Sequence, residues 1–186
     1  ASISRNEFSA DEWLDAVVPG TVLGGIATHG VIEDPYFGKN MQKISKQKFK
    51  SPWWYRTVFN LDADELEKNI SLRFNGINYR ADLWLNGQKV AEKNEFAGTY
   101  LMFTFNVNDY VKEGQNTLAL KIWQHADGEY SIRFVDWNPL PRDRNMGIFR
   151  DVFLEINEGV KVRSPFVWSK VNTETLKDAD LFVQAE

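Results

Sequence analysis

Short segments in which apolar and polar residues alternate recur along most of this chain. In residues 70–75, Ile, Leu and Phe alternate with Ser, Arg and Asn, which is the pattern of a strand that buries one face. Residues 81–86, 118–122 and 152–156 repeat this alternation, and residues 53–61 and 100–107 are strand-like as well. No helical stripe of useful length follows residue 30. Many short strands separated by turns predict an all-β fold, either a β-sandwich or a jelly roll.

Turn signals separate these strands and indicate where a domain ends. Asn86-Gly87 is the strongest hairpin signal in the chain and is typical of a type I′ turn. Gly159 closes one strand, a new strand is expected over residues 160–167, and residues 179–185 alternate weakly. We therefore expect a β-sandwich domain in residues 1–160. A linker and the first strands of a further β-sandwich domain should follow in residues 161–186.

The composition supports a packed domain and argues against several classes of function. Hydrophobic residues make up 43% of the 186 residues and aromatic residues 14%, which is enough for a sizeable core. The net charge is −4 and no basic stripe is present, which argues against nucleic acid as a partner. The sequence has no transmembrane run, so we expect no membrane partner. Without cysteine, and with His29 and His125 far apart, it predicts neither a metal site nor a cofactor.

The most informative stretch is residues 136–152, where a polar loop leads through a glycine into a strand. Pro139 and Pro141 hold the backbone of this loop extended, so Trp137 is expected on a stiff loop at the end of a sheet. An indole beside the carboxylate of Asp136 and the amide of Asn138 suits a sugar ring, which offers C–H faces and hydroxyls. The alternative is that Trp137 plugs the end of the sandwich core, because most tryptophans are largely buried.

Five blocks of sequence together resemble the N-terminal sugar-binding domain of family 2 glycoside hydrolases. They are Val-Pro-Gly-Thr-Val-Leu at 18–23, Asp-Pro-Tyr-Phe-Gly-Lys-Asn at 34–40, Trp-Trp-Tyr-Arg-Thr-Val-Phe at 53–59, Phe-Asn-Gly-Ile-Asn-Tyr-Arg-Ala-Asp-Leu-Trp-Leu-Asn-Gly at 74–87, and residues 136–152. The resemblance covers roughly residues 15–185. The Asp-Trp-Asn-Pro loop at 136–139 is most similar to the exo-β-glucosaminidase and β-mannosidase branches, and less similar to the β-galactosidases.

The resemblance implies a jelly-roll, galactose-binding-domain-like sandwich that accompanies immunoglobulin-like domains and a catalytic (β/α)-barrel in the same chain. The substrate would be a β-linked carbohydrate, cleaved with retention by two glutamates of the barrel, downstream of this sequence. Retaining chemistry needs two carboxyl groups about 5 Å apart. The neighbouring glutamate pairs here, at 65 and 67, 92 and 95, and 155 and 158, are typical of a solvated surface. We therefore expect no catalytic residue in this chain.

The resemblance also suggests which residues meet the substrate. Asp136 matches the family aspartate that binds hydroxyls of the terminal sugar, and Trp137 and Asn138 are its neighbours. Asp143 is a further candidate, with a salt-bridged loop as its alternative. Asp34 either caps the turn before Pro35 or lines the substrate cleft.

Two functions of other classes remain open. One is a free-standing carbohydrate-binding module with no hydrolase partner, in which exposed Trp and Tyr side chains on the sandwich itself would hold the sugar. The other is an interaction domain without a ligand. The partial strand at the chain end favours a domain of a longer glycosidase.

Overall fold

The computed structural model describes residues 2–132, 137 and 140–186. It divides into two compact units, Ala1–Ile156 and Asn157–Glu186. The division falls before residue 157, whereas the sequence placed it before residue 161. The strand at this boundary, Val152–Asn157, ends two residues before Gly159, the glycine used as the signal.

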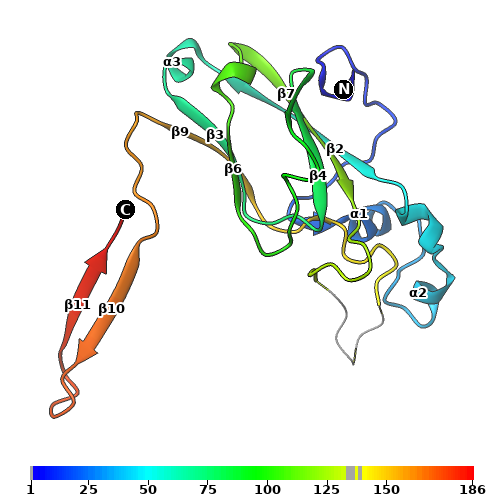
Figure 1. Ribbon diagram of the computed structural model, residues 1–186. Helices are drawn as coiled ribbons and strands as arrows, with labels where there is room; N and C mark the ends of the chain where they lie inside the picture. Colours follow the sequence, from blue (N-terminus) through cyan, green and yellow to red (C-terminus); the bar gives the residue numbers. More distant parts are fainter. Residues whose placement is uncertain (1, 133–136, 138–139) are drawn as a thin grey trace. The chain divides into compact units, whose positions relative to one another are not determined.

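The first unit is a sandwich of two sheets, which Figure 1 shows as facing layers. One sheet has the strand order β2 (Trp53–Leu61), β7 (Gly114–Trp123), β4 (Arg80–Leu85) and β5 (Gln88–Ala91), with every neighbouring pair antiparallel. The other has the order β6 (Phe103–Asn106), β3 (Asn69–Phe74) and β9 (Val152–Asn157). The all-β prediction is therefore confirmed.

The core lies between the two sheets and follows the predicted alternation. Leu83 and Leu85 of β4 are fully buried, and β7 places Leu120 and Leu118 opposite them in register. Asn86 and Gly87 both have positive φ angles, 51° and 85°, as a type I′ turn requires. The predicted hairpin thus joins β4 to β5.

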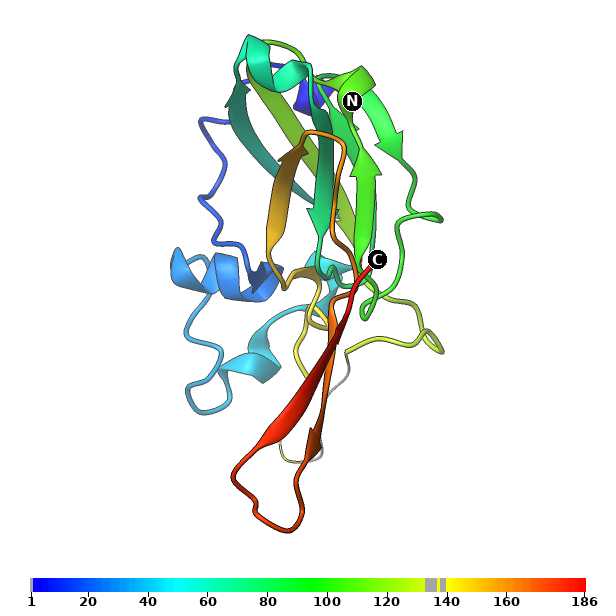
Figure 2. The ribbon, with the colours of Figure 1, turned by 90° about the vertical axis from the view of Figure 1, so that its left-hand side faces the viewer.

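Short helices and a two-stranded pair close one end of the sandwich. They are α1 (Val22–Thr28), α2 (Asn40–Lys43) and the 3₁₀ turn Lys46–Phe49, together with β1 (Gly20–Thr21) paired to β8 (Gly147–Ile148). Figure 2 shows the blue and cyan helices of residues 22–43 below the strands of the sheets, near the yellow loop. At the other end lie α3 (Ala63–Leu66) and the 3₁₀ turn Asn108–Tyr110; a further 3₁₀ turn, Ser2–Ser4, opens the chain.

The second unit is a single antiparallel hairpin of β10 (Phe166–Val171) and β11 (Ala179–Gln184). Trp168 and Phe182 face each other across it with ring centroids 3.9 Å apart. The strand expected from residue 160 begins only at Phe166, because Pro165 has no N–H to donate and Ser164 has a φ angle of 47°. Every residue of both strands is exposed.

Within the described part of the chain, no helix has the length and apolar character needed to cross a membrane.

Candidate functional site

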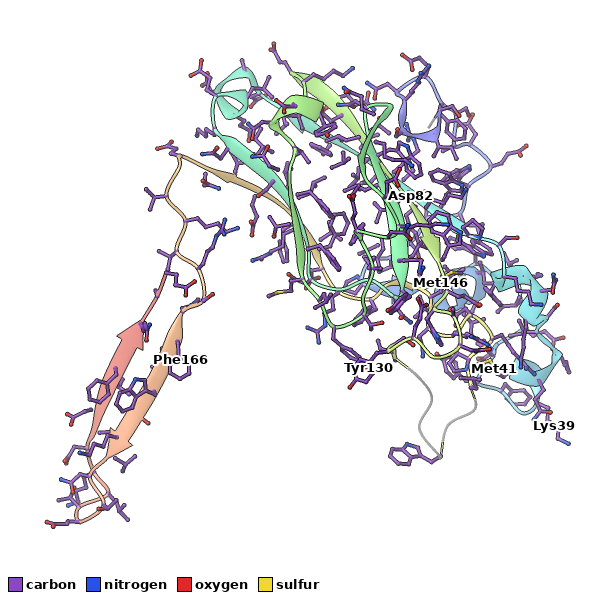
Figure 3. The ribbon with its side chains drawn as sticks, in the orientation of Figure 1. Lys39, Met41, Asp82, Tyr130, Met146 and Phe166 are labelled. Carbon is purple, nitrogen blue, oxygen red and sulfur yellow. The ribbon has the colours of Figure 1, made fainter. Side chains whose placement is uncertain are left out.

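Loops from four parts of the sequence gather at the end of the sandwich that carries α1 and α2. They are residues 29–52, 97–102, 124–132 and 140–147, which include the labelled side chains of Met41, Tyr130 and Met146 in Figure 3. Of the residues predicted to meet a sugar, Asp34 belongs to the first of these segments and Asp143 to the last. The chain therefore brings these two candidates to one end of the fold.

Asp143 is buried at the base of this end and caps helix α1. Its Oδ2 accepts a hydrogen bond of 2.9 Å from the N–H of Leu23, and its Oδ1 accepts one of 3.0 Å from the N–H of Asn145. The side chain of Thr21 also donates to Asp143, and Thr21 accepts from the N–H of Gly24. With an exposed fraction of 0%, Asp143 offers no surface to a sugar and serves to join the loop to the helix.

The two arginines beside Asp143 bond to other groups, so the salt-bridged loop foreseen for Asp143 is not what the structure contains. Arg142 donates from Nε to the carbonyl of Met41 at 2.8 Å and from Nη2 to that of Gln42 at 2.9 Å. Arg144 pairs with Asp127 at 2.8 Å. Both contacts tie the 140–147 loop to neighbouring loops at the same end.

Asn78 links three segments through one buried side chain. Its amide donates to the carbonyls of Arg144 and Asn145, at 3.0 and 2.9 Å, and its Oδ1 accepts from the hydroxyl of Thr99 at 2.7 Å. Its backbone exchanges two hydrogen bonds of 2.8 Å with Gly147. Sequence analysis missed Asn78, because it lies between the alternating segments 70–75 and 81–86, where the pattern gives no signal of burial.

Asp34 caps a turn, and its carboxylate stays exposed. Its Oδ1 accepts a hydrogen bond of 2.9 Å from the N–H of Tyr36, and Asn40 donates to its carbonyl at 3.1 Å. The capping role suggested by the sequence is therefore present. Because the Asp34 carboxylate is exposed, its second suggested role, at a substrate cleft, is taken up under the proposed function.

Trp137 is 81% exposed, so it does not plug the sandwich core. The indole stands in solvent. Asp136 and Asn138, the other two residues of this prediction, lie outside the described residues.

Burial controls the ionisation of two groups under the loops. It raises the pKa of the Asp143 carboxyl, against the opposing effect of the hydrogen bonds from Leu23, Asn145 and Thr21. It also raises the pKa of the Tyr55 hydroxyl, to which the charge of Asp143 adds. Asp143 is fully buried, whereas Tyr55 is half-buried.

Three of the glutamates considered for catalysis, one from each pair, have structural partners. Glu65 accepts from the N–H of Asp62 at 2.8 Å in a capping box, Glu92 pairs with Lys89, and Glu155 pairs with Arg73 at 3.1 Å. In residues 2–132, 137 and 140–186, no group of three or more His, Asp or Glu side chains could hold a metal ion. What this end can do is present an aromatic face and polar loop groups from a fixed base.

Comparison with known proteins places these features in a family. A family model described as the glycosyl hydrolase 2 galactose-binding domain-like family matches residues 3–132. The exo-β-D-glucosaminidase of Amycolatopsis orientalis is 34% identical over 100% of this chain and 18% of its own length. A mannosylglycoprotein endo-β-mannosidase of Lilium longiflorum is 30% identical over 81% of this chain and 18% of its own.

Solved structures give the same picture. The exo-chitosanase of Amycolatopsis orientalis superimposes with a TM-score of 0.90 at 35% identity, over 98% of this chain and 21% of its own. A β-D-mannosidase of Dictyoglomus thermophilum does so with a TM-score of 0.69 at 28% identity, over 89% of this chain and 23% of its own. The chain thus spans about a fifth of the length of these relatives.

Proposed function

We propose a function for this chain on the premise that it belongs to the glycosyl hydrolase 2 galactose-binding domain-like family. It acts as the non-catalytic N-terminal domain of a retaining exo-β-glycosidase. Its loops shape the entrance of the active site and contact the terminal sugar of a β-linked carbohydrate. The two catalytic carboxylates come from a further domain of the same polypeptide, which is consistent with a chain that spans about a fifth of the length of its relatives.

The observation that carries the proposal is the exposed indole of Trp137, six residues before a segment that is hydrogen-bonded to the sandwich. Asn78 and Asp143 join residues 143–147 to the sandwich. Residues held in this way lose little conformational freedom when a ligand binds beside them. An exposed tryptophan offers a flat apolar face to the C–H groups of a sugar ring.

The proposal assigns the following roles to the candidate residues. Asp136 and Asn138 supply hydrogen bonds to sugar hydroxyls beside Trp137, and the exposed carboxylate of Asp34 lines the same entrance. Asp143, being buried, positions the loop and does not touch the sugar. The hairpin of residues 166–184 begins an immunoglobulin-like domain, which a (β/α)-barrel accompanies.

The test uses the full-length enzyme with Asp136→Ala and Trp137→Ala. Each lost charge-assisted hydrogen bond is worth about 1.5–3 kcal/mol, so kcat/KM toward an aryl β-glucosaminide should fall about ten- to a hundredfold in Asp136→Ala. Trp137→Ala should lower kcat/KM in the same direction. The melting temperature should stay within a degree or two. Asp64→Ala, an exposed aspartate in α3 at the opposite end, is the matched control and should keep full activity.

The isolated 186-residue chain separates this proposal from a free-standing binding module. We expect it to hydrolyse no aryl β-glucosaminide, β-mannoside or β-galactoside, and to bind the monosaccharides with a Kd in the millimolar range or weaker, about −4 kcal/mol. Micromolar binding in a calorimetric titration would favour the module. For Asp136→Ala in the full-length enzyme, a large fall in melting temperature with unchanged kcat/KM would instead make Asp136 a structural residue.

A further inference from the structure

Three of the seven tryptophans lie on the outer face of the four-stranded sheet, the face turned away from the core. Leu83 and Leu85, the strand neighbours of Trp84, are buried between the two sheets, so the indole of Trp84 projects to the other side. Trp84 is 8% exposed, whereas the other two tryptophans are partly exposed. With two lysines they form a continuous set of contacts, which we call the tryptophan–lysine face: Trp54, Trp84, Trp123, Lys93 and Lys121.

The register of the sheet brings the aromatic rings together. Trp54 of β2 lies opposite Lys121 of β7, and Trp84 of β4 lies opposite Ala119 of the same strand. Because Ala119 is small and fully buried, it leaves room for the two indoles, whose ring centroids lie 5.0 Å apart. Nζ of Lys121 stands 5.5 Å from the ring centroid of Trp54 and 5.2 Å from that of Trp123. One ammonium group is therefore shared by two tryptophans of neighbouring strands.

Two ammonium groups of this face have no carboxylate as partner. Nζ of Lys93 lies 5.1 Å from the ring centroid of Trp123. In residues 2–132, 137 and 140–186, no carboxylate oxygen lies within 4.0 Å of the ammonium group of Lys93 or Lys121. Asp82, which Figure 3 labels and which lies opposite Lys121 in register, accepts instead the backbone N–H of Lys93 at 2.8 Å. Contact with the rings restricts both lysine side chains, so a ligand that binds them costs little side-chain entropy.

These groups fit a sugar chain that carries a carboxylate on each ring. A partly exposed indole offers an apolar surface to the C–H groups of a pyranose. A carboxylate that meets an ammonium group forms a charge-assisted hydrogen bond, which is stronger than a bond between neutral groups. A neutral glycan would leave both ammonium groups without a partner, and nucleic acid carries more charge than two lysines can neutralise. A chain of uronic acids offers both features at every sugar.

We propose that the tryptophan–lysine face binds a polyuronate chain, at a second carbohydrate site of the domain. The site lies on strands β2, β4 and β7 and on the turn after β5, whereas the proposed function uses the segment at 136–138. The two proposals are independent, because the second site requires neither a catalytic domain nor a terminal sugar. Its consequence is attachment of the domain to an acidic polysaccharide, whichever glycoside the parent enzyme cleaves.

Electrophoresis of the 186-residue chain through native gels that contain soluble polygalacturonate tests the site. The chain has a net charge of −4, so a polyanion in the gel should not retard it unless a local site binds the polymer. We expect clear retardation, with an apparent affinity that falls about tenfold between about 0.02 and about 0.2 M NaCl, because salt screens exposed charges. Hydroxyethyl cellulose, a neutral glycan, and polyglutamate, which has carboxylates but no sugar, should leave the mobility unchanged. No retardation by polygalacturonate, or equal retardation by either comparison polymer, would overturn the proposal.

Substitutions then assign the binding to this face. Lys93→Met and Lys121→Met remove the charges and keep most of the side-chain length, and together they should lower the apparent affinity about tenfold or more. Lys46→Met, the same change in an exposed lysine of the 3₁₀ turn at the loop end, is the matched control and should keep the affinity of the unaltered chain. Trp123→Leu should weaken binding at both salt concentrations, because salt does not screen stacking. Equal affinities of the double variant and the control would show that the polymer binds elsewhere and that the proposal is wrong.

Discussion

A single buried carboxylate holds the candidate site to the domain. Asp143 satisfies N–H groups of Leu23 and Asn145, which are 120 and two residues away in sequence. Desolvation opposes the charged form of a buried carboxyl, and hydrogen bonds to it compensate only in part. The helix and the loop are therefore joined by a group whose own ionisation is unfavourable.

This predicts a pH-dependent difference between the chain and its Asp143→Asn variant. Burial raises the pKa of the Asp143 carboxyl in the folded chain above its ordinary value of 3.8, so protonation stabilises the fold. The contribution is fully present below the ordinary value and is lost as the pH rises through the raised one. The stability of the chain relative to Asp143→Asn, measured by urea unfolding, should thus fall as the pH rises above about 4.

Asp143→Ala supplies the control for the hydrogen bonds themselves. It should cost about 3 kcal/mol near pH 4, because it leaves the N–H groups of Leu23 and Asn145 unpaired, and this cost should shrink as the pH rises, in parallel with the difference from Asp143→Asn. A relative stability that rises with pH would show instead that the three hydrogen bonds outweigh burial and that the folded pKa is lowered.

At the scale of elements, the 140–147 loop and the 97–102 turn are joined to the sandwich by Asn78. Both segments lie at one end of the domain, and neither belongs to a sheet apart from Gly147 in β8. These two segments are held by hydrogen bonds of the Asn78 side-chain amide. Most of the sandwich is held instead by backbone hydrogen bonds between strands. Loss of one side chain should therefore loosen two loops together.

Asn78→Ala tests this coupling. The variant leaves two buried carbonyls and the hydroxyl of Thr99 without their partner, so the free energy of unfolding should fall by about 3 kcal/mol. Hydrogen exchange should accelerate at the N–H groups of Met146 and Gly98, one in each loop. Asn94→Ala, an exposed asparagine in the turn after β5, should change neither quantity. Faster exchange in only one loop would contradict the coupling.

Local sequence patterns predicted the strands and the hairpin turn well, but not the contacts between residues that are distant in the sequence. Alternation found the strands because each buries one face, and Asn86-Gly87 found the hairpin because few other residues adopt two positive φ angles in succession. The partners of Asp143 and Arg142 stand 120 and about 100 residues away, so no local pattern contains them. For Trp137, the average burial of tryptophan suggested a plug, and the structure shows an exposed side chain instead.

At the scale of the whole molecule, stability resides in the first unit. Its buried side chains form one cluster that runs from Val22 to Ile148, with Val152, Leu154 and Ile156 of β9 packed against it. The second unit has no buried residue among its strands, and an isolated two-stranded hairpin is marginally stable in water. The two units should therefore differ widely in their resistance to unfolding.

Deletion of residues 159–186 provides the measurement. We expect the shortened chain to melt within about two degrees of the 186-residue chain, because it keeps the whole buried cluster. Residues 166–184 should exchange their backbone hydrogens much faster than β7 in the longer chain. A fall of ten degrees or more on deletion would place part of the stability in the hairpin.

The exposed hairpin has a practical consequence for anyone who concentrates this protein. Val167, Trp168, Leu181 and Phe182 stand in solvent on two strands whose outer edges are open to pairing with another molecule. Aggregation then depends on the last 30 residues, while the sandwich determines the melting temperature. The protein should aggregate at temperatures where the core is still folded. Dilution, or a lysine placed on the edge of the hairpin, should slow this aggregation more than cooling does.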